Sequence, residues 1–320
     1  MRLSVILASF ALLIAPASAQ PPAAPGPATV IHAGTLLDRP GRPPRRNVSI
    51  LVRDGRIEAV RDGLVPVPEG GTLIDLSDRF VLPGLIDSHV HLTSDRAGVE
   101  GQLAEMTDSV PLRAYEAAWN ARKTLDAGFT TVRNLGSDDG ITLGLRDAIA
   151  RGWAIGPRIV DAGTSISATT GHMDPTLGIR EEFHDDLLRS GSTCDGADDC
   201  RRAVRRQIAR GADLIKIATT GGVNSRIGLG LGAQMFEDEV RAIVETAHLY
   251  GKRVAVHAHG ADGINLALRA GADSIEHGTL LDDESLRLWR SSRAYYVPTL
   301  STINGYRERL AANPGAYRGE

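Results

Sequence analysis

Short apolar runs alternate with amphipathic segments along most of the chain. The runs Leu214–Ala218, Val254–His257 and Ser274–His277 each follow a glycine that is typical of a helix end. Each run also carries a polar residue, either within it or at its carboxyl end. Strands that alternate with amphipathic helices in this way predict βα units and a parallel sheet. The pattern therefore predicts an α/β fold, and polar residues at the carboxyl ends of many strands indicate a (β/α)8 TIM barrel.

Two histidines follow another apolar run with one residue between them. His89 and His91 come after Phe80–Ile86, which predicts a buried strand with an irregular entry at Pro83-Gly84. Side chains two positions apart in a strand point to the same side, so we expect the two imidazoles to lie together. Such a pair suits a divalent metal of the zinc type, although one core histidine beside one surface histidine would give the same pattern.

Lys216 stands in the middle of an apolar run, where an ammonium group is costly to bury. A protonated lysine also cannot bind a metal, because it has hydrogen-bond donors only. A carbamate, formed when the amine reacts with carbon dioxide, would remove both difficulties and could bridge two cations. The alternative is a lysine whose stem lies along the strand and whose head reaches solvent.

Together these residues resemble the ligand set of the amidohydrolase superfamily in its two-metal, carboxylated-lysine form. His89 and His91 match the ligands after the first barrel strand, and Lys216, His257 and His277 match those after the fourth, fifth and sixth. Other segments resemble a narrower group, which contains Xaa-Pro and Xaa-Arg dipeptidases and N-acyl amino acid hydrolases: 128–133, 156–159, 220–223 and 257–260. The resemblance runs from about residue 28 to the end of the chain.

The resemblance implies a hydrolase with two divalent metal ions, zinc being the first expectation, and a carbamate on Lys216. A hydroxide that bridges the metals would attack the amide bond of a dipeptide or an N-acyl amino acid. His172 would be catalytic, donating a hydrogen bond to the carbonyl oxygen, and His259 would orient His257. Arg226 would clamp a substrate carboxylate, and Tyr296 would line the pocket. The structural alternatives are a loop histidine, an exposed arginine and a core tyrosine.

The family also carries an aspartate after its eighth barrel strand, which takes the proton of the attacking water. Only seven barrel strands are predicted here, the last at Ala294–Pro298, and a helix over Thr302–Arg309 follows it. We therefore expect residues 80–320 to form a hydrolase barrel whose final strand-helix unit is missing, as in a fragment of a longer protein.

Residues 28–79 are expected to form a small β region ahead of the barrel. Four short strands are predicted there: 29–37, 47–53, 56–60 and 72–76. Asp54-Gly55 between the second and third strands is typical of a tight hairpin turn. The resemblance implies that this region is part of a β-sandwich, normally completed by strands from the C-terminus.

The first residues have the pattern of a secretory signal peptide, predicted at 1–19. An apolar stretch, Leu3–Ile14, precedes Ala17-Ser18-Ala19 and is too short to span a bilayer as a stable helix. A Pro/Ala-rich linker over 20–27 follows. The sequence therefore predicts a periplasmic or secreted protein.

The two cysteines, Cys194 and Cys200, close a short polar segment. In an oxidising compartment such a pair predicts a disulfide. The alternative is a metal pair, but no nearby histidine or third cysteine completes a zinc set.

Composition narrows the classes of partner. Hydrophobic residues make up 42% of the chain, which is ample for a core, and the net charge of −3 argues against nucleic acid. The expected partner is a small-molecule substrate with an amide bond and a carboxylate, with no membrane; a homo-oligomer stays open. Two other functions also stay open: a lactone, cyclic amide or phosphotriester hydrolase on the same centre, and an inactive truncated metal-binding fragment.

Overall fold

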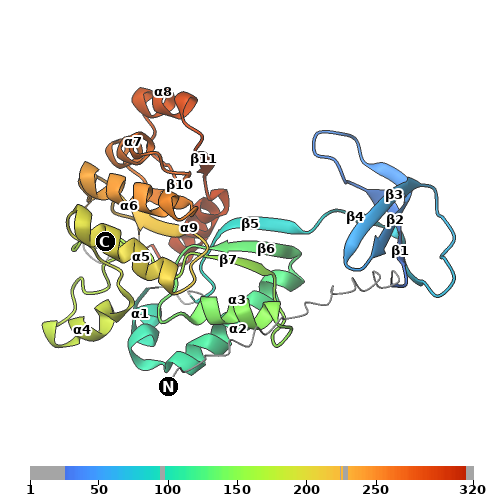
Figure 1. The fold of residues 1–320 in the computed structure, drawn as a ribbon, viewed down its shortest axis with the longest axis horizontal. Coiled ribbons are helices and arrows are strands. Elements are labelled where there is room, and N and C mark those ends of the chain that lie inside the picture. The colour runs from blue at the N-terminus through green and yellow to red at the C-terminus, as the bar shows by residue number, and fades with distance from the viewer. Residues whose placement is uncertain (1–25, 94–97, 224, 226–229, 315–320) are drawn as a thin grey trace, which may run out of the picture. The chain divides into compact units, whose positions relative to one another are not determined.

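The structure is a computed structural model that describes residues 26–93, 98–223, 225 and 230–314 (Figure 1). It divides into two compact units, residues 1–83 and 84–320. The predicted signal peptide, most of the linker and Arg226 lie outside the described residues.

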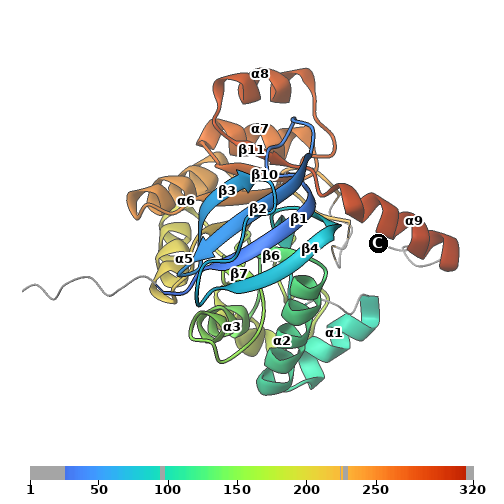
Figure 2. The same cartoon turned by 90° about the vertical axis from the view of Figure 1, so that its right-hand side faces the viewer.

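The first unit contains one four-stranded sheet in the order β3-β2-β1-β4 (Figure 2). Its strands are β1 (Thr29–Leu36), β2 (Arg45–Arg53), β3 (Arg56–Asp62) and β4 (Thr72–Val81). The predicted hairpin is confirmed, because β2 and β3 pair antiparallel across Asp54 and Gly55, both of which have positive φ angles. The described strands of this unit form a single sheet, whereas a sandwich needs a second one.

The second unit contains two sheets in which every pair of neighbouring strands is parallel (Figure 1). Their strands are β5 (Leu85–Val90), β6 (Phe129–Asn134), β7 (Arg158–Asp161), β8 (Ile215–Ala218), β9 (Val254–Ala258), β10 (Ser274–His277) and β11 (Tyr295–Val297). A parallel bridge from Ile166 to Ile217 links the segment after β7 to β8. Leu135, Ala162 and Ala255 belong to one buried cluster, so the two sheets share an apolar interior.

Helices connect the parallel strands, as the sequence predicts. They are α1 (Gly98–Thr107), α2 (Val110–Asp126), α3 (Ile141–Ala150), α4 (His184–Leu187), α5 (Ala197–Ala209), α6 (Glu237–Leu249), α7 (Ala261–Ala270), α8 (Asp283–Ser291) and α9 (Leu300–Ala312), with 3₁₀ turns at Glu181–Phe183 and Leu188–Ser190. α2 packs on β6, α3 on β7, α5 on β8 and α7 on β9 (Figure 1). Within the described part of the chain, no helix combines the length and the apolar character needed to cross a bilayer.

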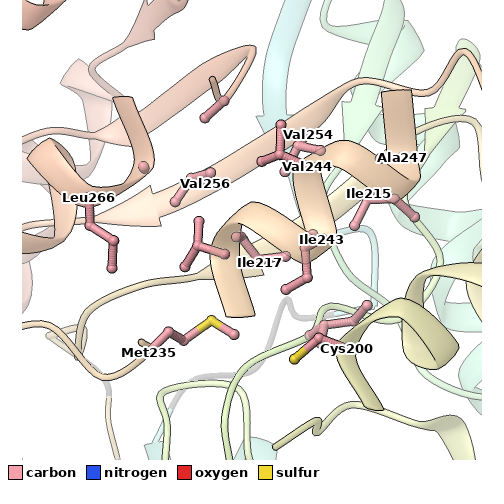
Figure 3. Packing of buried hydrophobic residues seen from close by; sticks show 14 of the residues in the cluster. Cys200, Ile215, Ile217, Met235, Ile243, Val244, Ala247, Val254, Val256 and Leu266 are labelled. Carbon is pink, nitrogen blue, oxygen red and sulfur yellow. The ribbon is translucent and has the colours of Figure 1, made fainter. Parts of the chain in front are cut away.

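The largest apolar core lies between β8–β10 and α5–α7. Every residue of β8 and β9 is buried, since this sheet is covered by helices on one side and by the shared interior on the other. Figure 3 shows side chains of β8 and β9, such as Ile217 and Val256, packed with Ile243 and Val244 of α6. This half of the unit is therefore a rigid base for the polar residues at its strand ends.

The expectation of a buried strand over Phe80–Ile86 is wrong. Phe80 belongs to β4 of the first unit, and β5 begins only at Leu85. Phe80 is 55% exposed, and Leu85 and Ile86 are 42% and 68% exposed. The physical reason is that β5 pairs only with β6 in the described chain, so it is an edge strand whose other side has no neighbouring strand there.

Candidate metal centre

Six histidines gather beyond the carboxyl ends of the parallel strands. β5 carries His89 and leads into His91, β9 carries His257 and leads into His259, β10 ends at His277, and His172 lies in the loop after β7. Their ring centroids are 4.2 Å apart for His172–His257, 4.7 Å for His257–His277, 4.8 Å for His257–His259 and His259–His277, 4.9 Å for His89–His277 and 5.4 Å for His89–His91. The four histidines expected as ligands are thus brought into one cluster.

His257, His259 and His277 form the tightest group within this cluster. Each has a ligand atom within 4.8 Å of the ligand atoms of the other two, so the three could bind one ion together. Sequence reasoning gave His259 only an orienting role. The alternation of side chains along β9 also indicates a role as a ligand for His259, because His257 and His259 are two residues apart.

His277 is also held in an unusual backbone conformation. Its φ angle is 69°, in the left-handed region that favours glycine. Thr299 shares this feature with a φ angle of 47°, and its hydroxyl lies 2.9 Å from His277 Nδ1. Backbone strain of this kind concentrates at functional sites, where the surrounding structure enforces it.

Glu276 is a residue of the candidate site that the sequence analysis does not predict. Its side chain is fully buried, and one carboxylate oxygen lies 2.9 Å from His89 Nδ1. The other oxygen accepts hydrogen bonds from Arg133 and from Ser274, both at 2.6 Å. Because an ionised carboxylate only accepts, His89 Nδ1 carries the hydrogen and Nε2 stays free to bind a metal.

Backbone carbonyls fix the tautomers of two further histidines. His91 Nδ1 lies 3.3 Å from the Gly136 oxygen, and His257 Nε2 lies 3.3 Å from the Gly221 oxygen. A carbonyl oxygen only accepts, so in each pair the ring nitrogen is the donor. The nitrogen left for a metal is therefore Nε2 in His91 and Nδ1 in His257.

Lys216 stands fully buried in β8, at 1% exposure, and its Nζ atom has no hydrogen-bond partner. Burial lowers the pKa of this amine to about 8, while the Glu276 carboxylate partly opposes the shift. The alternative of a head that reaches solvent is excluded. A buried amine without a partner is costly. Conversion to a carbamate would remove this cost and turn the side chain into a metal ligand. The residues present thus fit a metal centre.

The histidines around Lys216 are held in their neutral form. Burial lowers the pKa of His89, His172, His257 and His277, and the positive charge of Lys216 lowers each further. For His172 the pKa falls to about 4. A neutral imidazole is the form that binds metal, so the cluster needs no deprotonation to do so at neutral pH.

The loop that carries His172 is tied to its neighbours on both sides. His172 Nδ1 lies 2.9 Å from the Ser225 hydroxyl, and its backbone N–H donates to Gln234. Three residues earlier, the Thr169 backbone N–H donates to Asp195, which lies inside the loop closed by the disulfide. The predicted Cys194–Cys200 disulfide is present.

The other two substrate residues differ in their placement. The Tyr296 hydroxyl donates to the backbone oxygen of Gly278, next to His277, while its ring packs edge-on against Trp289 at 5.3 Å. Arg226 lies outside the described residues. No strand follows β11 in the described chain, so the aspartate expected after an eighth strand has no counterpart there.

Comparison with known proteins gives one family. Residues 80–314 match the model of the amidohydrolase family. Ochratoxinase from Aspergillus niger is 32% identical over 302 residues, a match that covers 89% of this chain and 61% of the ochratoxinase. The chain therefore spans about three fifths of the length of that relative.

Solved structures agree with this assignment. A Xaa-Pro dipeptidase with bound methionine in the active site superposes with a TM-score of 0.82 at 37% identity, covering 91% of this chain and 72% of that one. A prolidase complexed with N-methylphosphonate-L-proline gives 0.78 at 32% identity, covering 91% and 70%. These neighbours identify the second unit as a TIM-barrel-like α/β fold.

Proposed function

Because the chain belongs to the amidohydrolase family, we propose that it is a metal-dependent hydrolase that cleaves the amide bond of dipeptides or N-acyl amino acids. The neighbours named Xaa-Pro dipeptidase and prolidase support a peptide-type substrate. The observation that carries the proposal is the Lys216 amine, buried without a partner beside the histidine cluster. In this proposal the second unit is a (β/α)8 barrel without its final strand-helix unit, and the site lies at the carboxyl ends of its strands.

The proposed centre contains two divalent metal ions, with zinc as the first expectation from imidazole ligands. His89 and His91 would hold one ion, and His257 and His277 the other, with His259 as an added candidate. When bound, the ions supply Lewis acidity and lower the pKa of a water molecule.

Lys216 would hold both ions as a carbamate. In its formation the neutral amine attacks the carbon of carbon dioxide, a C–N bond forms, and one proton leaves to solvent. The lowered pKa of the Lys216 amine favours this reaction, since it raises the fraction of neutral amine near pH 7. The Lys216 amine has no hydrogen-bond partner in the described chain. As a carbamate, its added oxygens would instead bind the metal ions.

His172 would act on the substrate itself. It lies against His257 with ring centroids 4.2 Å apart, and Ser225 contacts its Nδ1 atom. Its Nε2 atom would donate a hydrogen bond to the scissile carbonyl oxygen as negative charge develops there. Arg226 and Tyr296 are proposed to contact the substrate carboxylate and the pocket wall.

The proposal also includes export of the protein to the periplasm or out of the cell. The disulfide Cys194–Cys200 supports it, because such bonds persist in oxidising compartments.

The test is metal content and hydrolysis measured on the same preparation. We would load the protein with zinc, manganese or cobalt in bicarbonate buffer, count metals by mass spectrometry, and assay Xaa-Pro dipeptides, N-acetyl amino acids and a lactone. The expected result is two metals per chain and release of an amino acid. The Lys216→Ala variant should lose both.

Two outcomes would contradict the proposal. Protein that binds no metal under any of these conditions would remove the centre itself. Protein that binds two metals but opens only the lactone would keep the centre and overturn the amide substrate.

A further inference from the structure

A cavity of about 220 Å³ adjoins the histidine cluster, with His91 and His172 in its wall. Pockets that hold a whole small molecule usually have about 300–1,000 Å³. The cavity is therefore the size of a subsite, large enough for one substituent of a substrate whose reacting bond lies at the metal centre.

Arg113 is the cation in the wall of this cavity. It lies on α2 and is only 8% exposed, although arginine is rarely buried without a close partner. Its nearest carboxylate in the described chain is Asp139, at 3.9 Å from Nη1, which is too long for a hydrogen bond. The guanidinium has five N–H donors and gives no hydrogen bond to any described residue.

The cavity carboxylates interact with Arg113 through charge alone, because neither Asp138 nor Asp174 accepts a hydrogen bond from it in the described chain. Asp174 already accepts hydrogen bonds from the backbone of Thr170 and from the backbone and hydroxyl of Thr176. Burial raises the pKa of Asp138, while the charge of Arg113 partly lowers it. The hydroxyl of Ser192, another wall residue, is buried and also lacks a partner in the described chain.

We propose that this cavity binds a carboxylate of the substrate through Arg113. A guanidinium pairs with a carboxylate through two parallel N–H···O bonds, which supplies what Arg113 lacks. The carboxylate is either the α-carboxylate or an acidic side chain. Arg113 is a different residue from the proposed carboxylate clamp, and the inference rests on the proposed hydrolase function for its substrate.

Three probes of equal size distinguish the two sources of the carboxylate: N-acetyl-L-aspartate, N-acetyl-L-asparagine and the α-amide of N-acetyl-L-aspartate. Kd would be measured by calorimetry on metal-free protein, which cannot turn the probes over, and hydrolysis of the same compounds would be followed separately on metal-loaded protein. The variants are Arg113→Met, which removes the charge, and Arg113→Lys, which keeps it. The matched control is Arg122→Met, on the same helix, where the arginine is half exposed and pairs with Asp126.

We expect one of the two amide probes to bind wild type about 10-fold to 100-fold more weakly than N-acetyl-L-aspartate. Arg113→Met should abolish that difference, Arg113→Lys should restore part of it, and Arg122→Met should leave it unchanged. The probe that binds weakly identifies the carboxylate.

The inference is overturned if wild type binds all three probes equally, or if Arg113→Met weakens all three by the same factor. Either result would mean that Arg113 has a structural role only. Because binding is measured without turnover, a protein that binds as expected but hydrolyses nothing contradicts the proposed reaction and leaves the subsite intact.

Discussion

The two halves of the histidine cluster are held in place by different means. His257 and Lys216 stand on strands whose every residue is buried under α5–α7. His89 stands on β5, an edge strand whose Ile86 is 68% exposed. A packed core therefore positions the first half, which stands on β8 and β9. The second half relies on one buried carboxylate, Glu276, which reaches His89 from β10.

This difference gives the two halves different weak points. On β8 and β9 a ligand's position is shared among many apolar contacts, so no single neighbour decides it. On β5 the orientation of His89 depends on a hydrogen-bond network of Glu276, Arg133 and Ser274. We therefore expect substitutions in the network to affect one metal selectively, and substitution of Lys216 to affect both.

Lys216→Met should give the largest functional effect, removing both metals and more than about 1,000-fold of kcat/KM. The same change should leave the metal-free protein equally stable or more stable by about 1–3 kcal/mol, because an amine without a partner is replaced by an apolar chain. Metal counting and urea unfolding in the presence of a chelator measure the two effects. Lys252→Met, at a partly exposed position before β9, is the control. A destabilised metal-free variant would show that the amine is well accommodated.

Glu276→Gln should break the network that serves β5. We expect a loss of about 3 kcal/mol in unfolding free energy, since one partner of a buried ion pair is removed, and loss of one metal out of two. Glu284→Gln is the matched control, because Glu284 pairs with Arg269 on the surface, where such pairs contribute about 1 kcal/mol or less. Equal loss of both metals would refute the division into halves.

The same comparison explains what could be predicted from the sequence. Each predicted metal ligand lies in or directly after a short apolar run, which is a local signal in the sequence. These ligands are His89, His91, Lys216, His257 and His277. Two-residue spacing then places neighbouring imidazoles on one side of a strand. The disulfide and the hairpin turn are local features in the same sense.

The residues that were missed depend on contacts between distant parts of the chain. His89 and Glu276 are 187 positions apart, and Arg133 and Glu276 are 143 apart. Nothing near any one of them indicates the pairing, which exists only once β5, β6 and β10 come together. The burial of β5 was misjudged for a related reason. An apolar run shows that side chains prefer burial and does not show whether a neighbouring strand covers them.

Removal of the disulfide should affect the His172 loop without affecting the metal ligands. The double variant Cys194→Ala/Cys200→Ala opens a seven-residue loop, and chain entropy predicts a loss of about 2 kcal/mol. Because Asp195 in that loop accepts from Thr169, we expect kcat to fall while metal content stays at the wild-type value. Urea unfolding, metal counting and steady-state kinetics measure these quantities. A loss of metal would show that the loop supports the ligands as well.

A further expected effect is a pH dependence of stability in the metal-free protein. The pKa of His172 is about 4 in the folded state against 6.5 for an unperturbed histidine, chiefly because of burial. The folded state thus binds fewer protons than the unfolded chain between these values, so stability falls as pH drops from 6.5 towards 4. One such group contributes at most about 1.4 kcal/mol per pH unit.

The variant His172→Gln removes this titratable group and tests how much of the pH dependence of stability comes from it. Unfolding free energies of wild type and variant, measured from pH 7 to pH 4 with a chelator present, should converge as the pH falls. Between pH 6.5 and 4 the slope of the wild type should be steeper, and the two slopes should be equal above about pH 7. Parallel curves would mean that His172 has the same pKa in the folded and unfolded states, so that burial does not disfavour its protonation.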